Sequence, residues 1–452
     1  MPIGDTTVEK TPSQEGAPGE EAKTRRPSRW AVLRNANFRL RWLGGSISVL
    51  GDSFYMIALP WLVLQLTGNA LAVGTVLALA GVPRALFMLV GGAVTDRLSA
   101  RTIMLVSNLA RAALVALLTA LVLTGAVALW QLYALALAFG LVDAFFYPAA
   151  AAIMPLIVGR EHLQVANSLS QGTSQLAMFV GPALAGLLIA ALDVGRAQGV
   201  AADVPRREGI GLAFAVDVLA FLFSATTLWL MRLDRPKEEG AAGGEGLWSS
   251  IRSGLASVWH DQALRLFFLI VAAINLLTTG PFVVGLPVLA NQRYAEGAAA
   301  LGIVMSAYGG GSLVGTVLAG VLPRPAPGRM GFYLLGVTFL MGIEMAVLGF
   351  VDATPLAAGL TFAVGVGDGY AVILFLTWLQ ARTAQAMQGR IMSLLMFAAV
   401  GLSPLSNALT GALLEVSAAV TFVAAGGLLV VIVVAVSFHP AARNMAVVNE
   451  PY

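Results

Sequence analysis

Seven charged side chains lie well inside long apolar stretches of this sequence, where their chemistry would be unusual. They are Asp52, Arg84, Arg111, Asp143, Asp217, Glu344 and Asp368. A charge in lipid-like surroundings is costly, so it is usually paired or functional. A carboxyl group without a cationic partner favours its protonated form in a medium of low dielectric constant, as a proton carrier must. The five acids are therefore candidates for proton coupling, and the two arginines are their candidate charge partners.

Depth along each helix indicates which of these charges can pair. At about 1.5 Å per residue, Asp52 lies about 20 Å and Arg84 about 16 Å from the same end of two consecutive apolar stretches, so their side chains can meet. Arg111 and Asp143 can pair in the same way between the next two stretches. The other three acids have no basic residue at their depth. For each acid the alternative is a static pair, or a neutral acid that only fixes helix packing.

The stretches that carry these charges have the length and composition of membrane-spanning helices. Hydrophobic residues make up 58% of the chain and charged residues only 11%, whereas soluble proteins are about one quarter charged. A helix needs about 20 apolar residues to cross the hydrocarbon, and runs this long exclude the alternating strands of a membrane barrel. We expect twelve spans, near residues 40–66, 70–95, 102–124, 127–150, 163–192, 209–231, 263–290, 299–321, 331–351, 354–379, 390–414 and 417–438.

The spans fall into two groups of six, which predicts an all-α membrane protein built as a repeat. The expected parts are a disordered cytoplasmic tail (1–37), an N-terminal six-helix bundle (38–231), a cytoplasmic linker with an amphipathic helix (232–262), a C-terminal six-helix bundle (263–438) and a second cytoplasmic tail (439–452). Arginine and lysine are concentrated in the loops on the side of the two termini, so both termini are expected in the cytoplasm. Repeats of this kind bind substrate near the middle of the membrane, between the halves.

Several classes of chemistry find no support in the sequence. There is no cysteine, and the three histidines lie near the edges of apolar runs. None of the three lysines sits in a phosphate-binding loop of the type used for ATP hydrolysis. There is also no hydrolytic triad, metal-binding cluster or basic stripe suited to nucleic acid. We therefore assign no enzyme activity, no cofactor, no metal and no nucleic-acid partner, and any active transport would use an ion gradient.

Three segments carry a family resemblance that covers nearly the whole chain. The loop after the second span reads GGAVTDRLSAR over residues 91–101 and resembles the signature loop of the major facilitator superfamily. The fifth span reads GTSQLAMFVGPALAG over 172–186, which is similar to the antiporter motif of exporters in that superfamily. DAFFYPA over 143–149 resembles the branch with macrolide-efflux and enterobactin-exporter proteins. The resemblance implies twelve transmembrane helices in two pseudo-symmetric six-helix bundles.

The resemblance also implies roles for particular residues. The cytoplasmic gate loop would comprise Gly92, Asp96, Arg97 and Arg101. We expect this loop to form a latch with the start of span eleven at Arg390. Gly92 would let two helices approach closely. The antiporter motif would comprise Gly172, Gly181, Pro182 and Gly186, bending and thinning the fifth span. The substrate cavity would be lined by Tyr55, Asn275, Phe282, Tyr370, Phe375 and Trp378, together with Asp52 and Asp368. The alternatives are an exposed tight turn for the gate loop and plain helix packing for the other two sets.

The function expected from these features is export of small amphiphilic molecules, such as drug-like compounds or secondary metabolites, in exchange for protons by alternating access. The partners would be a small-molecule substrate, the proton as coupling ion and the lipid bilayer. The protein would act as a monomer that crosses a bacterial-type inner membrane many times. Two alternatives stay open: a dedicated exporter of one native product such as a siderophore or lysophospholipid, and a non-transporting membrane sensor with the same fold.

Overall fold

The computed structural model describes residues 31–159, 162–193, 207–232, 259–323, 330–382, 391, 394–395, 398 and 400–439. Regular structure in these residues is helical throughout: η1 (Ala31–Arg34), α1 (Ala36–Thr67), α2 (Ala70–Arg97), α3 (Ala100–Leu123), α4 (Leu129–Ile157), α5 (Leu163–Asp193), α6 (Glu208–Leu230), α8 (Gln262–Gly280), η4 (Pro281–Gly285), α9 (Leu286–Gln292), α10 (Ala298–Val321), α11 (Met330–Leu348), α12 (Thr354–Arg382), α14 (Ser403–Leu414) and α15 (Ala418–Ser437). Most of the predicted tails and of the linker 232–262 lies outside the described residues.

Eleven helices of the described part are long and apolar enough to cross a membrane, which confirms the prediction of an all-α membrane protein. One of them, Leu264–Gln292, joins α8, η4 and α9. The π-helical turn η4 begins at Pro281, whose missing N–H cannot continue the hydrogen-bond ladder of an α-helix. The predicted span 390–414 is described mainly as the 12 residues of α14.

The short links between spans have residues suited to ending one helix and starting the next. Gly68 follows α1 with φ of 63°, and its N–H bonds to the Leu64 carbonyl oxygen. Glycine takes up this left-handed backbone at no steric cost. The Asn69 side chain then accepts a hydrogen bond of 2.8 Å from the Ala72 N–H and caps α2. These two residues fold α1 and α2 into an antiparallel hairpin.

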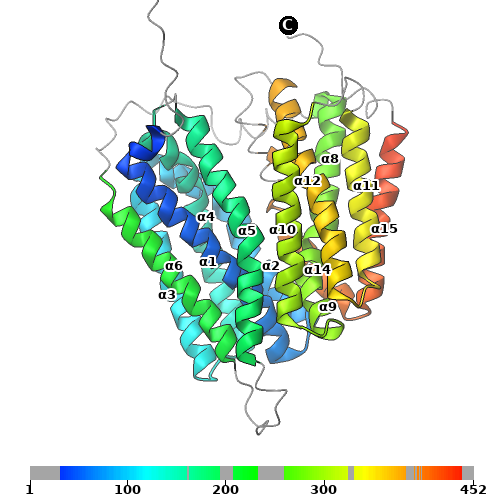
Figure 1. Ribbon diagram of the computed structural model, residues 1–452. Coiled ribbons are helices and arrows are strands. Elements are labelled where there is room, and N and C mark those ends of the chain that lie inside the picture. Colours follow the sequence, from blue (N-terminus) through cyan, green and yellow to red (C-terminus); the bar gives the residue numbers. More distant parts are fainter. Residues whose placement is uncertain are drawn as a thin grey trace, which may run out of the picture.

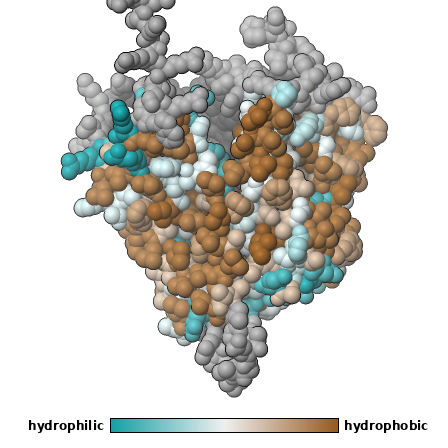
Figure 2. Space-filling model, in the orientation of Figure 1, coloured by the Kyte–Doolittle hydropathy of each residue, from teal (hydrophilic) through white to brown (hydrophobic). Residues whose placement is uncertain are grey.

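The helices form two bundles that stand side by side, α1–α6 in one and α8–α15 in the other (Figure 1). Apolar side chains cover the middle of the visible face, and hydrophilic ones gather toward its two ends (Figure 2). This distribution suits a protein surrounded by lipid.

The bundles pack against each other through glycines at one end. A Cβ atom on Gly186 of α5 would overlap the Ala298 carbonyl oxygen of α10 and lie 3.0 Å from the Gly302 Cα. A Cβ atom on Gly74 of α2 would lie 2.9 Å from the Gly411 Cα of α14. Small residues let membrane helices approach this closely. We call this region the packed end; it comprises residues 61–81, 178–186, 291–309 and 404–415.

Candidate functional site

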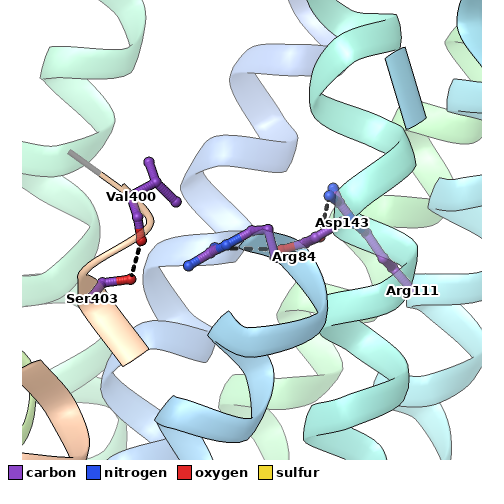
Figure 3. A network of polar contacts seen from close by, with 5 residues as sticks. All are labelled: Arg84, Arg111, Asp143, Val400 and Ser403. Atoms are coloured by element: carbon purple, nitrogen blue, oxygen red, sulfur yellow. Dashed lines mark hydrogen bonds and ion pairs between the residues drawn. The ribbon is translucent and has the colours of Figure 1, made fainter. Parts of the chain in front are cut away.

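The N-terminal bundle contains a buried network of charges centred on Asp143 of α4. The Arg111 guanidinium on α3 donates a short hydrogen bond to one Asp143 oxygen, as the sequence predicts. The Arg84 guanidinium on α2 lies 3.7 Å from the other oxygen. Figure 3 shows the carboxylate between the two arginines. Asp143 and Arg111 are buried, so water cannot screen this interaction.

Close packing of α2 against α4 decides which acid Arg84 meets. A Cβ atom on Gly140 of α4 would overlap the carbonyl oxygen of Ala80 on α2. Arg84 and Asp143 follow these contact residues by about one turn each, so their side chains meet at one level. The expected pairing of Arg84 with Asp52 is therefore wrong in this conformation. Consecutive helices need not be the closest neighbours, and here α2 packs on α4 more than on α1.

Two further acids lie beside this network without a bonded cation in the described part of the chain. Asp217 of α6 is 0% exposed, and neither of its carboxyl oxygens has a hydrogen-bond partner there. A Cβ atom on Gly51 of α1 would lie 2.7 Å from the Asp217 Oδ1, so the glycine leaves room for the carboxyl group. Asp52, next to Gly51, is within electrostatic range of Arg111, Asp143 and Asp217. The N-terminal cluster thus joins Asp52, Arg84, Arg111, Asp143 and Asp217.

Aromatic rings surround the arginine of this cluster. The Arg111 Cζ lies 3.9 Å from the centroid of the Phe146 ring and 5.6 Å from that of Phe221. A guanidinium over an aromatic face is stabilised by the ring quadrupole. Tyr55, a predicted cavity residue, stacks on Phe139 with centroids 4.9 Å apart and belongs to the same group of aromatic rings. These rings surround the Arg111 guanidinium, and the side chain is buried among them.

The C-terminal bundle contains a cavity of about 510 Å³, to which Glu344 of α11 and Asp368 of α12 both contribute. The structure therefore separates the five candidate acids into two groups, one in each bundle. Four predicted lining residues, Asn275, Phe282, Asp368 and Phe375, lie on the wall of this cavity.

Two other predicted lining residues of the C-terminal bundle are held by aromatic neighbours. Tyr370 is buried and meets the ring of Tyr333 edge-on, with centroids 5.0 Å apart. Trp378 is buried and lies 5.8 Å from the ring of Phe267. Neither is among the residues that line the 510 Å³ cavity. Their role as substrate contacts stays a prediction.

The gate loop is described only in part, because the side chains of Asp96 and Arg97 and the whole of Arg390 lie outside the described residues. Arg101 donates hydrogen bonds to the carbonyl oxygens of Leu228 at 2.7 Å and Trp229 at 2.6 Å, at the end of α6. A cation there satisfies carbonyl groups that the helix leaves unbonded. The predicted latch stays a prediction.

The close helix approach expected at Gly92 occurs at the neighbouring glycine instead. A Cβ atom on Gly91 would overlap the Ala144 carbonyl oxygen of α4, whereas one on Gly92 would meet no described atom within 4 Å. One residue turns the helix by about 100°, which moves Gly92 off the contact face.

The antiporter motif divides by helix face. Gly186 faces α10 across the bundle interface, and a Cβ atom on Gly181 would lie 2.5 Å from Ser53 of α1. The Ala183 N–H, next to Pro182, donates a 2.8 Å hydrogen bond to the Ser306 hydroxyl of α10. No described atom lies within 4 Å of a Cβ atom on Gly172. The glycine at this position therefore allows no close helix contact with the described residues in this conformation.

Sequence reasoning missed a carboxylate that joins the bundles at the packed end. Glu415, just after α14, accepts hydrogen bonds from the N–H groups of Ala70 at 3.0 Å and Leu71 at 3.2 Å. These are the first two residues of α2, whose amino terminus carries positive partial charge. Nearby, the Gln65 side chain donates a 3.2 Å hydrogen bond to the Asn291 side chain. A glutamate directly after a span was visible in the sequence, but its partner across the interface was not.

Glu415→Ala is expected to weaken the packed end. Loss of one exposed carboxylate at a helix amino terminus should lower the population of the packed state about two- to fivefold. Because the chain has no cysteine, a Gln65→Cys/Asn291→Cys pair can report closure through its rate of oxidative cross-linking. Glu415→Gln, which keeps an acceptor oxygen, should fall between Ala and the unchanged residue. Equal cross-linking rates in all three proteins would contradict a role for the carboxylate.

Two bundles of membrane-spanning helices, each with buried carboxyl groups, define a multi-pass membrane transporter rather than an enzyme. The chain belongs to the Major Facilitator Superfamily, whose family profile matches residues 41–406. "Multidrug efflux pump Tap" of Mycolicibacterium fortuitum is 28% identical over 411 residues, which cover 89% of this chain and 95% of that protein. "Macrolide efflux protein A" of Streptococcus pyogenes is 22% identical, covering 68% of this chain and 71% of that protein.

A solved structure agrees with this assignment at the level of the fold. The nucleoside transporter NupG superposes with a TM-score of 0.61 at 13% identity, covering 88% of this chain and 98% of that chain. The predicted superfamily and its drug-efflux branch are thereby confirmed.

Proposed function

We propose that this protein exports small amphiphilic molecules in exchange for protons by alternating access. Similarity to a multidrug efflux pump and a macrolide efflux protein supports export of drug-like compounds. The N-terminal cluster supports proton coupling. In this proposal, protons bind to the cluster in one bundle while the two bundles rock about the substrate.

The observation that carries the proposal is the missing counter-charge in the N-terminal cluster. The cluster holds three carboxyl groups but only two guanidinium groups, and both guanidinium groups form ion pairs with Asp143. Asp217 is fully buried, and its oxygens have no hydrogen-bond partner in the described residues. A buried ion without a partner is costly, whereas a bound proton removes its charge. Asp217, with Asp52 beside it, is therefore the proposed proton site.

Arg84 offers a route from protonation to movement of the bundles. Its side chain is 28% exposed, and it lies one turn from Gly81. A Cβ atom on Gly81 would lie 2.7 Å from the Pro404 Cγ of the C-terminal bundle. In Figure 3 the Arg84 guanidinium points from Asp143 toward the Val400–Ser403 turn. In this proposal a proton bound at Asp217 passes to Asp143 within the cluster, where it would weaken the Arg84 ion pair next to the bundle interface.

Proteoliposomes test the coupling directly. A pH-sensitive dye trapped inside reports proton movement when ethidium, an amphiphilic cation, is added under an imposed pH gradient. Asp217→Asn should reduce ethidium-driven proton movement about tenfold or more, because an amide cannot carry the proton. Glu208→Gln, an exposed change on the same helix, should leave it unchanged. Undiminished proton movement in Asp52→Asn, Asp143→Asn and Asp217→Asn alike would overturn proton coupling through this cluster.

The same assay separates the alternatives. Movement of a single native product, such as a siderophore or lysophospholipid, with no response to unrelated drugs would favour the dedicated exporter. Silence with every compound would favour the non-transporting sensor.

The proposed orientation places both termini in the cytoplasm. Arg34, Arg39 and Arg41 at the start of α1, Arg101 at the start of α3 and Arg265 at the start of α8 support it, because basic residues concentrate on the cytoplasmic side. The packed end then faces outward, and the gate loop would latch the opposite end when the transporter turns over. Labelling of single cysteines placed near each end in intact cells tests the orientation.

A further inference from the structure

The cavity in the C-terminal bundle has the size and lining of a small-molecule site. Its volume of about 510 Å³ lies between α8, α10, α11 and α12, within the range of about 300–1,000 Å³ typical of ligand pockets. Its wall is mostly aliphatic and aromatic. Phe267 of α8 stacks on Phe375 of α12 with centroids 3.8 Å apart, and Phe282 lies 5.0 Å from Tyr308. These rings offer faces for an apolar or cationic ligand.

Two carboxyl groups enter this apolar cavity. Glu344 is 8% exposed, lines the cavity and forms no hydrogen bond or ion pair with any described residue. Asp368 accepts a 2.8 Å hydrogen bond from the Tyr308 hydroxyl. Both carboxyl groups lie within electrostatic range of that hydroxyl, so they act on the same space.

Among the described residues that line the cavity there is no lysine, arginine or histidine. This is the main difference from the N-terminal cluster, where two arginines neutralise carboxylate charge. Buried carboxylates without a cation are costly, and a cation that binds them from outside gains correspondingly. The two sites therefore suit different tasks: the N-terminal cluster contains its own cations, whereas the described lining of the C-terminal cavity supplies none.

We propose that this cavity binds the positively charged group of an amphiphilic organic cation, with Glu344 and Asp368 as its counter-charges. The site lies inside the C-terminal bundle rather than between the two bundles. Phe267, Phe375 and Phe282 contact the apolar body of the ligand. The inference rests on the proposed function only in treating the bound cation as cargo. It moves Glu344 from the candidate proton carriers to the substrate contacts, and it assigns Asp368, a candidate for both roles, to the substrate.

Equilibrium binding of tetraphenylphosphonium to the purified protein in detergent tests the site without any ion gradient. This cation is permanently charged, so its own protonation cannot change the result. Glu344→Gln should raise its dissociation constant about tenfold or more, because one of the two counter-charges of the cavity is lost. Asp368→Asn should weaken binding as well, and the double variant should show no saturable binding. Asp352→Asn, a 75% exposed side chain between α11 and α12, is the matched control and should bind normally.

A second variant keeps the test decisive if the amides disturb folding. Met341 lines the cavity three residues before Glu344, on the same face of α11. Met341→Lys would place an ammonium group beside the glutamate and take the position of the ligand's charge. We expect it to fold, with a melting temperature at least that of Glu344→Gln, and to lose tetraphenylphosphonium binding.

The outcomes distinguish this site from the proposed proton coupling. Wild-type protein that does not bind tetraphenylphosphonium, or Glu344→Gln and Met341→Lys variants that bind within twofold of wild type, would overturn the inference. Loss of binding in Asp217→Asn but not in Glu344→Gln would place the cation in the N-terminal bundle and also overturn it. Binding that depends on Glu344, in a protein without proton-driven transport, would uphold the cavity and reject the coupling.

Discussion

Arg111→Met is expected to destabilise the N-terminal bundle by about 3–5 kcal/mol, the usual cost of removing one partner from a buried ion pair. Arg111 is 3% exposed, bonds to Asp143 and lies over the ring of Phe146. Methionine fills similar space but leaves Asp143 with only the more distant Arg84 at 3.7 Å. Arg111→Lys keeps the charge but loses the planar fork that bonds and stacks at once, so its effect should be smaller but clear.

Thermal unfolding in detergent, followed by tryptophan fluorescence, measures this effect. The double variant Arg111→Met/Asp143→Asn removes both charges and should recover part of the lost stability, because the main cost is the unpaired carboxylate. Arg39→Met, an exposed arginine on α1, controls for loss of a positive charge. A double variant as unstable as the sum of its two single variants would show that the Arg111–Asp143 pair contributes no coupling energy.

Local patterns predicted the helices of this protein well. Long apolar runs marked the spans, and the Thr67–Asn69 link already contained the glycine and the asparagine cap that the hairpin uses. Depth along the helices also predicted the pairing of Arg111 with Asp143, since α3 and α4 are close neighbours. These features lie within one helix, at one short link or between consecutive helices. They can therefore be predicted from the local sequence.

Lateral packing of helices was beyond this reasoning. The partner of Arg84 depends on the contact of Gly140 with Ala80, two residues on helices that are not consecutive. Likewise, Glu415 and Ala70 are separated by 345 residues and meet only because the bundles dock. Such contacts require the rotation of each helix, which apolar runs leave undetermined.

Gly186→Ala is expected to disfavour closure of the packed end. A Cβ atom there would overlap the Ala298 carbonyl oxygen and lie 3.0 Å from the Gly302 Cα, both backbone atoms that cannot rotate away. Overpacking of this kind costs about 1–3 kcal/mol. The clash arises only when α5 and α10 are in contact. It therefore raises the free energy of the packed state alone and lowers the population of that state. Transport should fall because alternating access requires both end states.

Gly172→Ala is the matched control, since it makes the same change on the same helix where no described atom lies within 4 Å of the new Cβ atom. The Gln65→Cys/Asn291→Cys pair should cross-link about tenfold more slowly in the Gly186→Ala background, and at the original rate in the Gly172→Ala background. Both single variants should remain folded. The clash in Gly186→Ala lies at the interface between the bundles rather than in a bundle core, and Gly172→Ala creates no clash with a described atom. Fast cross-linking and undiminished transport in Gly186→Ala would mean that α5 and α10 tolerate a wider separation, and that this glycine does not set the closed position of the bundles.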